Sequence, residues 1–238
     1  MKKQKLKNGY ILSAYEEKYL KLGEKILENK YNILKEYKNT LRNYVAVIEI
    51  ENKKYVLKSP RNEHRIIQRK VGTLFKDGEA LTTLKNINEL IKNGLDIFAK
   101  PYLAIVKRKN GFIEESFILM EYVEAFEEKN KDLAIEYTKK MHEKKIYHGD
   151  CNPANFVITG NNSLKVIDTQ AKKMFFGKYR AHYDMLTMKM DSYREVKYPY
   201  KKDCWYYMAL GMKKFKKNSF IKNIKSIRKR IRNHGEEE

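Results

Sequence analysis

The spacing of apolar residues predicts a helix near the start of the chain and strands after it. Five apolar residues recur every three or four positions, with charged residues between them: Ile11, Tyr15, Tyr19, Leu22 and Ile26. This spacing is typical of an amphipathic helix, which we expect over residues 11–27, and a second helix is expected over 74–91. Strands are expected where short apolar runs lie between polar turns, at residues 31–36, 44–50, 55–58, 102–107 and 116–120.

The second half of the chain is predicted to be mostly helical. The expected elements are a helix over 131–144, a loop over 147–155, a hairpin with strands at 156–159 and 164–167, and helices from Tyr183 towards Arg232. We therefore predict an α+β protein of two lobes. Its parts are a strand-rich N-lobe over 1–120, a hinge over 121–125 and a helical C-lobe over 126–238.

The net charge points to an anionic partner without naming one. Lys and Arg together number 51 against 30 Asp and Glu, which gives a formal net charge of +21. Such an excess attracts nucleic acid, an anionic lipid surface or a phosphorylated substrate. A solvated, lysine-rich surface without a partner is the alternative. Because no motif that reads nucleic acid is present, no specific nucleic acid is expected as a partner.

The cysteines and the apolar runs predict a cytoplasmic protein. Cys151 and Cys204 have neither the spacing of a metal site nor that of a disulfide framework, so we expect reduced thiols. Charged residues recur throughout the segment that follows the basic N-terminus, so it contains no apolar run long enough for a signal peptide. No run approaches the roughly 20 apolar residues that span a bilayer. The chain is expected to be soluble, or peripheral on a membrane.

Three oxygen-bearing side chains lie at a spacing that suits phosphoryl transfer. Asp150 follows His148-Gly149, Asn155 comes five residues after Asp150, and Asp168 comes thirteen residues after Asn155, beyond a predicted hairpin. Phosphoryl transfer needs a group that positions the acceptor hydroxyl and hard oxygen ligands for Mg²⁺. A loop followed by a hairpin would bring the three side chains to one point. The alternative is a chance turn with a purely structural role.

This spacing resembles the catalytic loop of the protein kinase superfamily, in which an Asp, four residues, an Asn and a later Asp recur. The resemblance implies a protein kinase-like fold that binds ATP and Mg²⁺. It implies that Asp150 is the catalytic base, and that Asn155 and Asp168 are the metal ligands.

Further residues of the nucleotide site follow from the same resemblance. Lys58 ends an apolar strand after a hairpin, as the phosphate-binding lysine of kinases does. Glu79, on the following helix, is its expected partner, with Glu89 as the alternative. Glu121 and Val123 lie in the expected hinge, where main-chain groups would contact the adenine.

Several features depart from the protein kinase pattern. Residues 37–43, where a Gly-rich phosphate loop would stand, contain no glycine, so Lys38 or Arg42 is expected to contact phosphate there. Gly149 replaces the usual arginine, Thr169-Gln170 replaces Phe-Gly, and no Ala-Pro-Glu follows. These departures favour the small-molecule and sugar kinases of the superfamily.

Within that group, the chain resembles the bacterial lipopolysaccharide core heptose kinases. The runs that carry this resemblance are 148–155, 167–172 and 179–187, and it extends over residues 31–191. It implies ATP-dependent phosphorylation of a heptose hydroxyl on the inner core of lipopolysaccharide, at the cytoplasmic face of the inner membrane. The core oligosaccharide is then the expected acceptor.

The C-terminus is predicted to form a basic amphipathic helix. Residues 212–232 carry Lys and Arg and no acid, with apolar residues at helical spacing. Such a helix can dock on anionic headgroups. The alternative is that its apolar stripe packs on the C-lobe.

Two other functions stay open. The chain could be a Ser/Thr protein kinase or another small-molecule kinase of the same fold. It could also be a catalytically silent pseudokinase or basic binding module. The presence of Lys58, Asp150, Asn155 and Asp168 argues against a silent protein.

Overall fold

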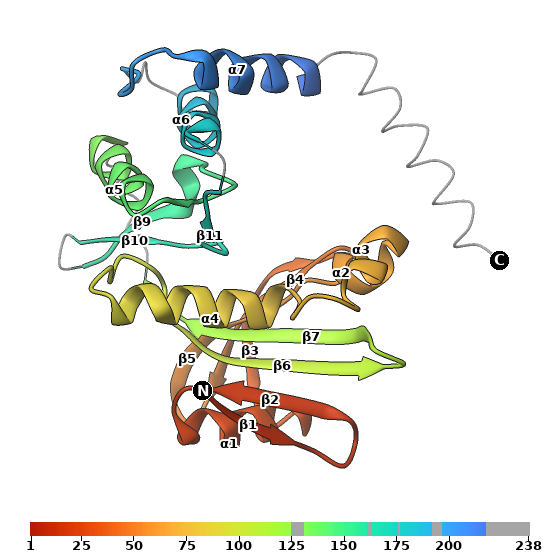
Figure 1. Cartoon of the computed structure of the whole chain (residues 1–238). Helices are drawn as coiled ribbons and strands as arrows, with labels where there is room; N and C mark the ends of the chain where they lie inside the picture. Colours follow the sequence, from red (N-terminus) through yellow and green to blue (C-terminus); the bar gives the residue numbers. More distant parts are fainter. Residues whose placement is uncertain (125–130, 161–162, 176, 192–196, 218–238) are drawn as a thin grey trace. The chain divides into compact units, whose positions relative to one another are not determined.

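The computed structural model describes residues 1–124, 131–160, 163–175, 177–191 and 197–217 (Figure 1). The chain divides into two compact units. One comprises Met1–Asn130 with Asn155–Ala171, and the other comprises Lys131–Ala154 with Lys172–Glu238. The hairpin expected at 156–167 therefore belongs to the same unit as the N-terminal sheet. The boundaries of 1–120, 121–125 and 126–238 for lobes and hinge stay a prediction.

A seven-stranded antiparallel sheet forms the first unit. In spatial order its strands are β1 (Lys2–Lys5), β2 (Tyr10–Ala14), β6 (Pro101–Lys109), β7 (Phe112–Glu121), β5 (Lys53–Ser59), β4 (Tyr44–Ile50) and β3 (Asn32–Asn39). The strands expected from short apolar runs, β3 to β7, are all present. The β6–β7 turn at Asn110-Gly111 has both residues at positive φ, as a tight hairpin requires.

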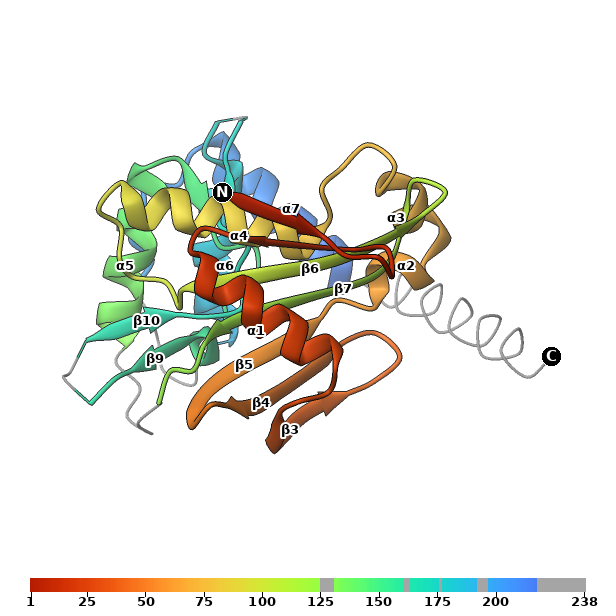
Figure 2. The same cartoon turned by 90° about the horizontal axis from the view of Figure 1, so that it is seen from below.

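Two helices cover opposite faces of this sheet (Figures 1 and 2). Helix α1 (Glu17–Leu27) packs on β2 and β6, and α4 (Glu79–Lys92) packs on β6 and β7. A Cβ on Gly23 would come within 3.0 Å of the Leu12 and Leu103 side chains, so glycine allows α1 to approach the sheet closely. Two short helices, α2 (Asn62–Arg65) and α3 (Ile67–Gly72), follow β5.

The prediction of a helix over 11–27 is wrong in its first part. Residues Tyr10–Ala14 form β2, which lies between β1 and β6, and the helix begins only at Glu17. Leu12, Ser13 and Ala14 are buried in succession because both faces of this strand are covered. A strand covered on both faces has no alternation to reveal it.

Helix α4 begins five residues later than the predicted start at residue 74. Gly78, with φ of 85°, precedes it, and a Cβ there would come within 2.3 Å of the Ile113 side chain. The Glu63 carboxylate accepts a hydrogen bond from the Glu79 N–H at 2.6 Å, and so caps the helix from a distant part of the sequence. Burial raises the pKa of the Glu63 carboxyl.

The hairpin of β9 (Phe156–Ile158) and β10 (Leu164–Val166) is bonded to residues 96–99, which follow α4. The Ala99 N–H donates to the Val166 carbonyl at 3.0 Å, and the Val166 N–H donates to the Ile97 carbonyl. Lys165 adds an ion pair to Asp96 at 3.0 Å. These bonds fix the residues on either side of the hairpin relative to the sheet.

The second unit consists of helices and one small sheet. Its elements are α5 (Lys131–Glu143), β8 (Ile146–Tyr147), β11 (Lys172–Lys173), α6 (Tyr179–Asp191) and α7 (Cys204–Lys217), with a 3-10 turn at Pro153–Asn155 where the chain passes to the first unit. Residues 218–232 of the predicted basic helix lie outside the described residues. Within the part of the chain that is described, every helix is too short or too polar to cross a bilayer.

Candidate active site

The structure joins Lys58 and Asp168, which are 110 residues apart in the sequence. Lys58 lies near the end of β5, and its Nζ is 3.1 Å from Oδ1 of Asp168. The lysine side chain is 20% exposed and the aspartate side chain 62%, so the ammonium is half-sheltered beside an accessible carboxylate. Asp168 has a φ of 56°, a left-handed conformation that aspartate tolerates better than most residues. An ammonium and a carboxylate held together in this way can bind phosphate and a cation side by side.

Asn155 lies next to this pair along the hairpin. Its carbonyl accepts a hydrogen bond from the Ile167 N–H at 2.9 Å, which places Asn155 beside the residue that precedes Asp168. On the other side, Asn86 of α4 donates from Nδ2 to the Gln170 carbonyl at 3.0 Å. The segment that carries Asp168 is therefore held from both ends, and Lys58, Asn155 and Asp168 lie in one unit.

The oxygen ligands in this unit suit magnesium. Among the described residues, no group of three or more His, Cys, Asp and Glu side chains could hold a metal by itself. Magnesium is commonly bound through one or two protein oxygens, with phosphate and water supplying the rest. Asp168 and Asn155 would fit that coordination.

Glu79 has a different contact from the one expected. In the described part of the chain, the ion pair of Lys58 is with Asp168, and none joins Lys58 to Glu79. Glu79 is the first residue of α4, and its N–H is held by Glu63. The alternative, Glu89, lies exposed further along the same helix. A role for either glutamate at the nucleotide stays a prediction.

The expected hinge residues lie at the end of β7. The Glu121 carboxylate accepts a hydrogen bond from the Lys100 N–H at 2.9 Å, and the Glu121 N–H donates to the Lys100 carbonyl at 2.8 Å. These bonds tie Glu121 to the start of β6. Val123 follows in a segment without regular secondary structure. If this segment binds adenine, its main chain rather than the Glu121 side chain would do so.

The turn between β3 and β4 contains no glycine, and side-chain hydrogen bonds hold its main chain. Thr40 accepts hydrogen bonds at Oγ1 from the N–H groups of Arg42 and Asn43, at 3.3 and 3.1 Å. Arg61 donates from Nη1 to Asn39 Oδ1 and to the Thr40 carbonyl, at 2.9 and 3.0 Å. This role of Arg61 could not be predicted from the sequence, because Arg61 lies beyond β5.

In the second unit, Asp184 of α6 anchors the loop that carries Asp150. Its carboxylate accepts hydrogen bonds from the N–H groups of His148 and Gly149, at 2.6 and 3.1 Å, and lies 3.3 Å from His142 Nε2. Asp184 is 1% exposed, whereas Asp150 is exposed. Gly149 has a φ of 89°, which favours glycine. Asp184 thus fixes the main chain next to the predicted base.

Sequence reasoning did not single out Asp184. The signal that could have found it is a carboxylate on the buried stripe of a helix, between apolar Ala181 and Met185. Buried carboxylates are rare unless they accept several hydrogen bonds.

The neighbouring thiol and the buried histidine serve the fold. Cys151 is fully buried beside Thr138, and burial raises the pKa of its thiol well above the ordinary value. It is therefore a neutral thiol and not a nucleophile. Burial also lowers the pKa of His182, whose Nδ1 lies 2.6 Å from the Tyr198 hydroxyl.

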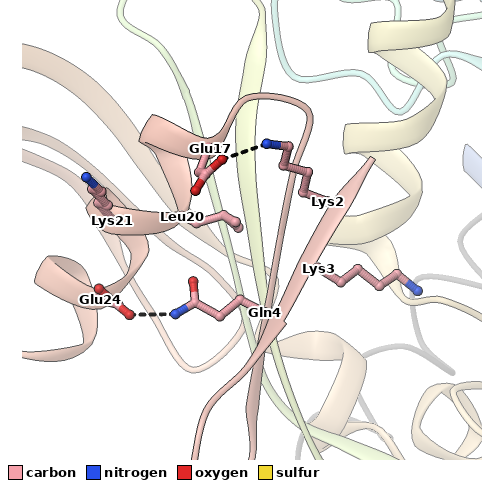
Figure 3. Close-up of a pocket in the computed structure, with 7 residues that line it drawn as sticks. All are labelled: Lys2, Lys3, Gln4, Glu17, Leu20, Lys21 and Glu24. Atoms are coloured by element: carbon pink, nitrogen blue, oxygen red, sulfur yellow. Dashed lines mark hydrogen bonds and ion pairs between the residues drawn. The ribbon is translucent and has the colours of Figure 1, made fainter.

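A surface hollow of about 590 Å³ lies between β1 and α1, and none of the predicted site residues lines it (Figure 3). Two contacts bridge it: Lys2 Nζ to Glu17 Oε2 at 2.6 Å and Gln4 Nε2 to Glu24 Oε1 at 2.7 Å. Its lining is exposed and polar, apart from Leu20. We assign it no chemistry.

Replacing Asp184 with asparagine tests its role as an anchor. The amide would turn a donor towards N–H groups that need an acceptor, so we expect a loss of about 2–4 kcal/mol in the free energy of unfolding. At a temperature where the variant is folded, kcat should still fall about tenfold or more, with KM for ATP close to wild type. Urea unfolding and steady-state kinetics measure both effects.

A buried hydroxyl on the same helix provides the control. Thr187 donates from Oγ1 to the Tyr183 carbonyl, so Thr187→Val should affect stability slightly and leave kcat unchanged. Wild-type kcat in folded Asp184→Asn would mean that the carboxylate supports the fold alone.

Comparisons with known proteins give a family and a fold for this chain. A family model described as "Lipopolysaccharide core biosynthesis protein (WaaY)" matches residues 1–227. A search of curated proteins found no match. Among solved structures, the chain is similar to one titled "WaaP in complex with acyl carrier protein", with a TM-score of 0.54 and 16% sequence identity, covering 76% of this chain and 80% of that chain. The likeness concerns the fold, and it confirms the predicted α+β, protein kinase-like class.

Proposed function

Because this chain belongs to the WaaY family of lipopolysaccharide core biosynthesis proteins, we propose that it transfers a phosphoryl group from ATP to a heptose hydroxyl of the inner core. Membership makes it a phosphotransferase of core biosynthesis, as the sequence predicted. The proposal goes beyond family membership in naming ATP as the donor and a heptose as the acceptor. The reaction would take place at the cytoplasmic face of the inner membrane.

The contact between Lys58 and Asp168 carries this proposal. A strand-borne ammonium beside a carboxylate that follows a hairpin is what binding a triphosphate together with its metal requires. In the proposed site, Lys58 neutralises phosphate oxygens, while Asp168 and Asn155 hold Mg²⁺. The bound ion would supply charge neutralisation on the transferred phosphoryl group.

The acceptor hydroxyl would be oriented by Asp150. Its position after Gly149, on the loop held by Asp184, supports this role. A carboxylate at this position can accept the hydroxyl proton during transfer. Residues of the β3–β4 turn, held by Arg61, would cover the phosphates in place of a Gly-rich loop.

The charge of the chain favours an anionic acceptor. The net charge of +21 would attract an acceptor that already carries phosphate or carboxylate groups. An inner core that bears such groups fits this requirement, whereas a neutral free sugar does not.

Mass spectrometry of the lipopolysaccharide core tests the proposal. Cells that lack the protein should lose one phosphate, about 80 Da, from a heptose, and the intact gene should restore it. A gene carrying Asp150→Asn should not restore the phosphate. The purified chain, ATP and Mg²⁺ should transfer phosphate to the core isolated from the deficient cells. An unchanged core, together with transfer to Ser or Thr peptides, would instead indicate a protein kinase.

A further inference from the structure

The segment around α3 exposes an unusual set of apolar side chains. Phe75 is 87% exposed and Ile67 is 78% exposed, and Val71 and Leu74 are exposed as well. Ile67, Val71 and Leu74 follow one another at intervals of four and three residues, so they share one side of α3 and the turn after it. We call these four side chains, together with Arg65, Arg69, Lys70 and Lys76, the α3 surface.

The fold holds the α3 surface in place. Arg108 of β6 donates hydrogen bonds to the carbonyls of Thr73 and Lys76, each at 2.7 Å, and to that of Gly111 at 2.6 Å. Thr73 accepts at Oγ1 from the Ile113 N–H at 3.1 Å. The turn that carries Leu74 and Phe75 is thus bonded to the β6–β7 hairpin, beside which α2 and α3 lie (Figures 1 and 2). These apolar residues are therefore exposed on a segment that hydrogen bonds hold against the sheet.

The charge of the α3 surface restricts what can cover it. Residues 65–76 contain four cations and no acidic residue. A second copy of this chain, with a net charge of +21, would be repelled. The C-terminal residues 218–232 are also basic, with no acid among them, and would be repelled for the same reason. An occupant must therefore be anionic and must also accept apolar side chains.

We propose that the α3 surface docks the protein on an anionic phospholipid membrane. Apolar and aromatic side chains would enter the boundary between headgroups and acyl chains, and the four cations would contact lipid phosphates. This inference rests on the proposed function, because an acceptor anchored in lipid requires an enzyme that works at the membrane surface. It adds a docking surface on the first unit, separate from the predicted C-terminal helix.

Vesicle sedimentation with the full chain tests the inference. The wild-type protein should bind phosphatidylglycerol vesicles, bind phosphatidylcholine vesicles weakly, and lose affinity as salt rises. The pair Ile67→Ser/Phe75→Ser and the pair Arg69→Ser/Lys70→Ser should each lower partitioning about tenfold or more. Phe175→Ser is the matched control, because Phe175 is 82% exposed and lies in the other unit.

Each outcome decides the inference. Four results would each overturn it. They are wild-type partitioning in both double variants, an equal loss of partitioning in Phe175→Ser, equal binding to neutral and anionic vesicles, and no vesicle binding by the wild-type protein. Phosphorylation of lipid-free core oligosaccharide should be unchanged in the double variants. Vesicle binding without any phosphoryl transfer would count against the proposed function and leave the docking surface standing.

Discussion

Replacing Asp150 with asparagine is expected to lower kcat by about 10²–10⁴-fold, the usual contribution of a general base. The amide preserves the size of the side chain but accepts a proton far less readily. ATP binding should stay close to wild type, because Lys58, Asn155 and Asp168 belong to the other unit. Single-turnover kinetics with isolated core and isothermal titration with a non-hydrolysable ATP analogue measure the two properties separately.

Asp132→Asn provides the matched control for this variant. Asp132 is an exposed aspartate on the first turn of α5, in the same unit as Asp150. We expect its replacement to leave kcat within about twofold of wild type, since surface substitutions rarely matter. Turnover by Asp150→Asn at the rate of the control would remove Asp150 from the chemistry.

Strands β4 and β5 could be predicted because each contains a short run of apolar residues next to a polar turn. Buried and less buried residues alternate along much of each strand. The pattern failed at β2, where the three successive residues Leu12, Ser13 and Ala14 are all buried. It also failed at α2, which has no apolar residue, and at α3, whose apolar residues Ile67 and Val71 are exposed.

The part of the candidate site that could be predicted consists of residues at a characteristic spacing along the chain. Asp150, Asn155 and Asp168 lie on one loop and one hairpin, so local sequence carries their order. The anchors could not be predicted in the same way. Asp184 and Arg61 act on main-chain groups of other segments, and main-chain partners leave no pattern of residue types. The expected pairing of Lys58 with Glu79 depended on the start of α4, which Gly78 moves to residue 79.

Replacing Asp168 with alanine is expected to abolish the dependence of nucleotide binding on Mg²⁺ and to lower kcat about 10³-fold or more. The carboxylate is the charged ligand of the proposed metal site, and the ion it holds neutralises the transferred phosphoryl group. In the proposed site, Lys58 would interact with both Asp168 and the incoming phosphates, and its ion pair with Asp168 would orient the ammonium before ATP binds. Without Asp168, Lys58 would still attract phosphate, and weak binding of ATP should persist in EDTA.

The control for Asp168→Ala is Asp96→Ala. Asp96 also forms an ion pair with a lysine, Lys165, in the same unit, and its side chain is 71% exposed. Exposed pairs of this kind contribute about 0–1 kcal/mol, so this variant should bind Mg-ATP and turn over like wild type. Titration of ATP in Mg²⁺ and in EDTA separates the two variants. If Asp168→Ala still bound ATP more tightly in Mg²⁺ by the wild-type factor, the metal would be held elsewhere, and Lys58 with Asp168 would form only a structural ion pair.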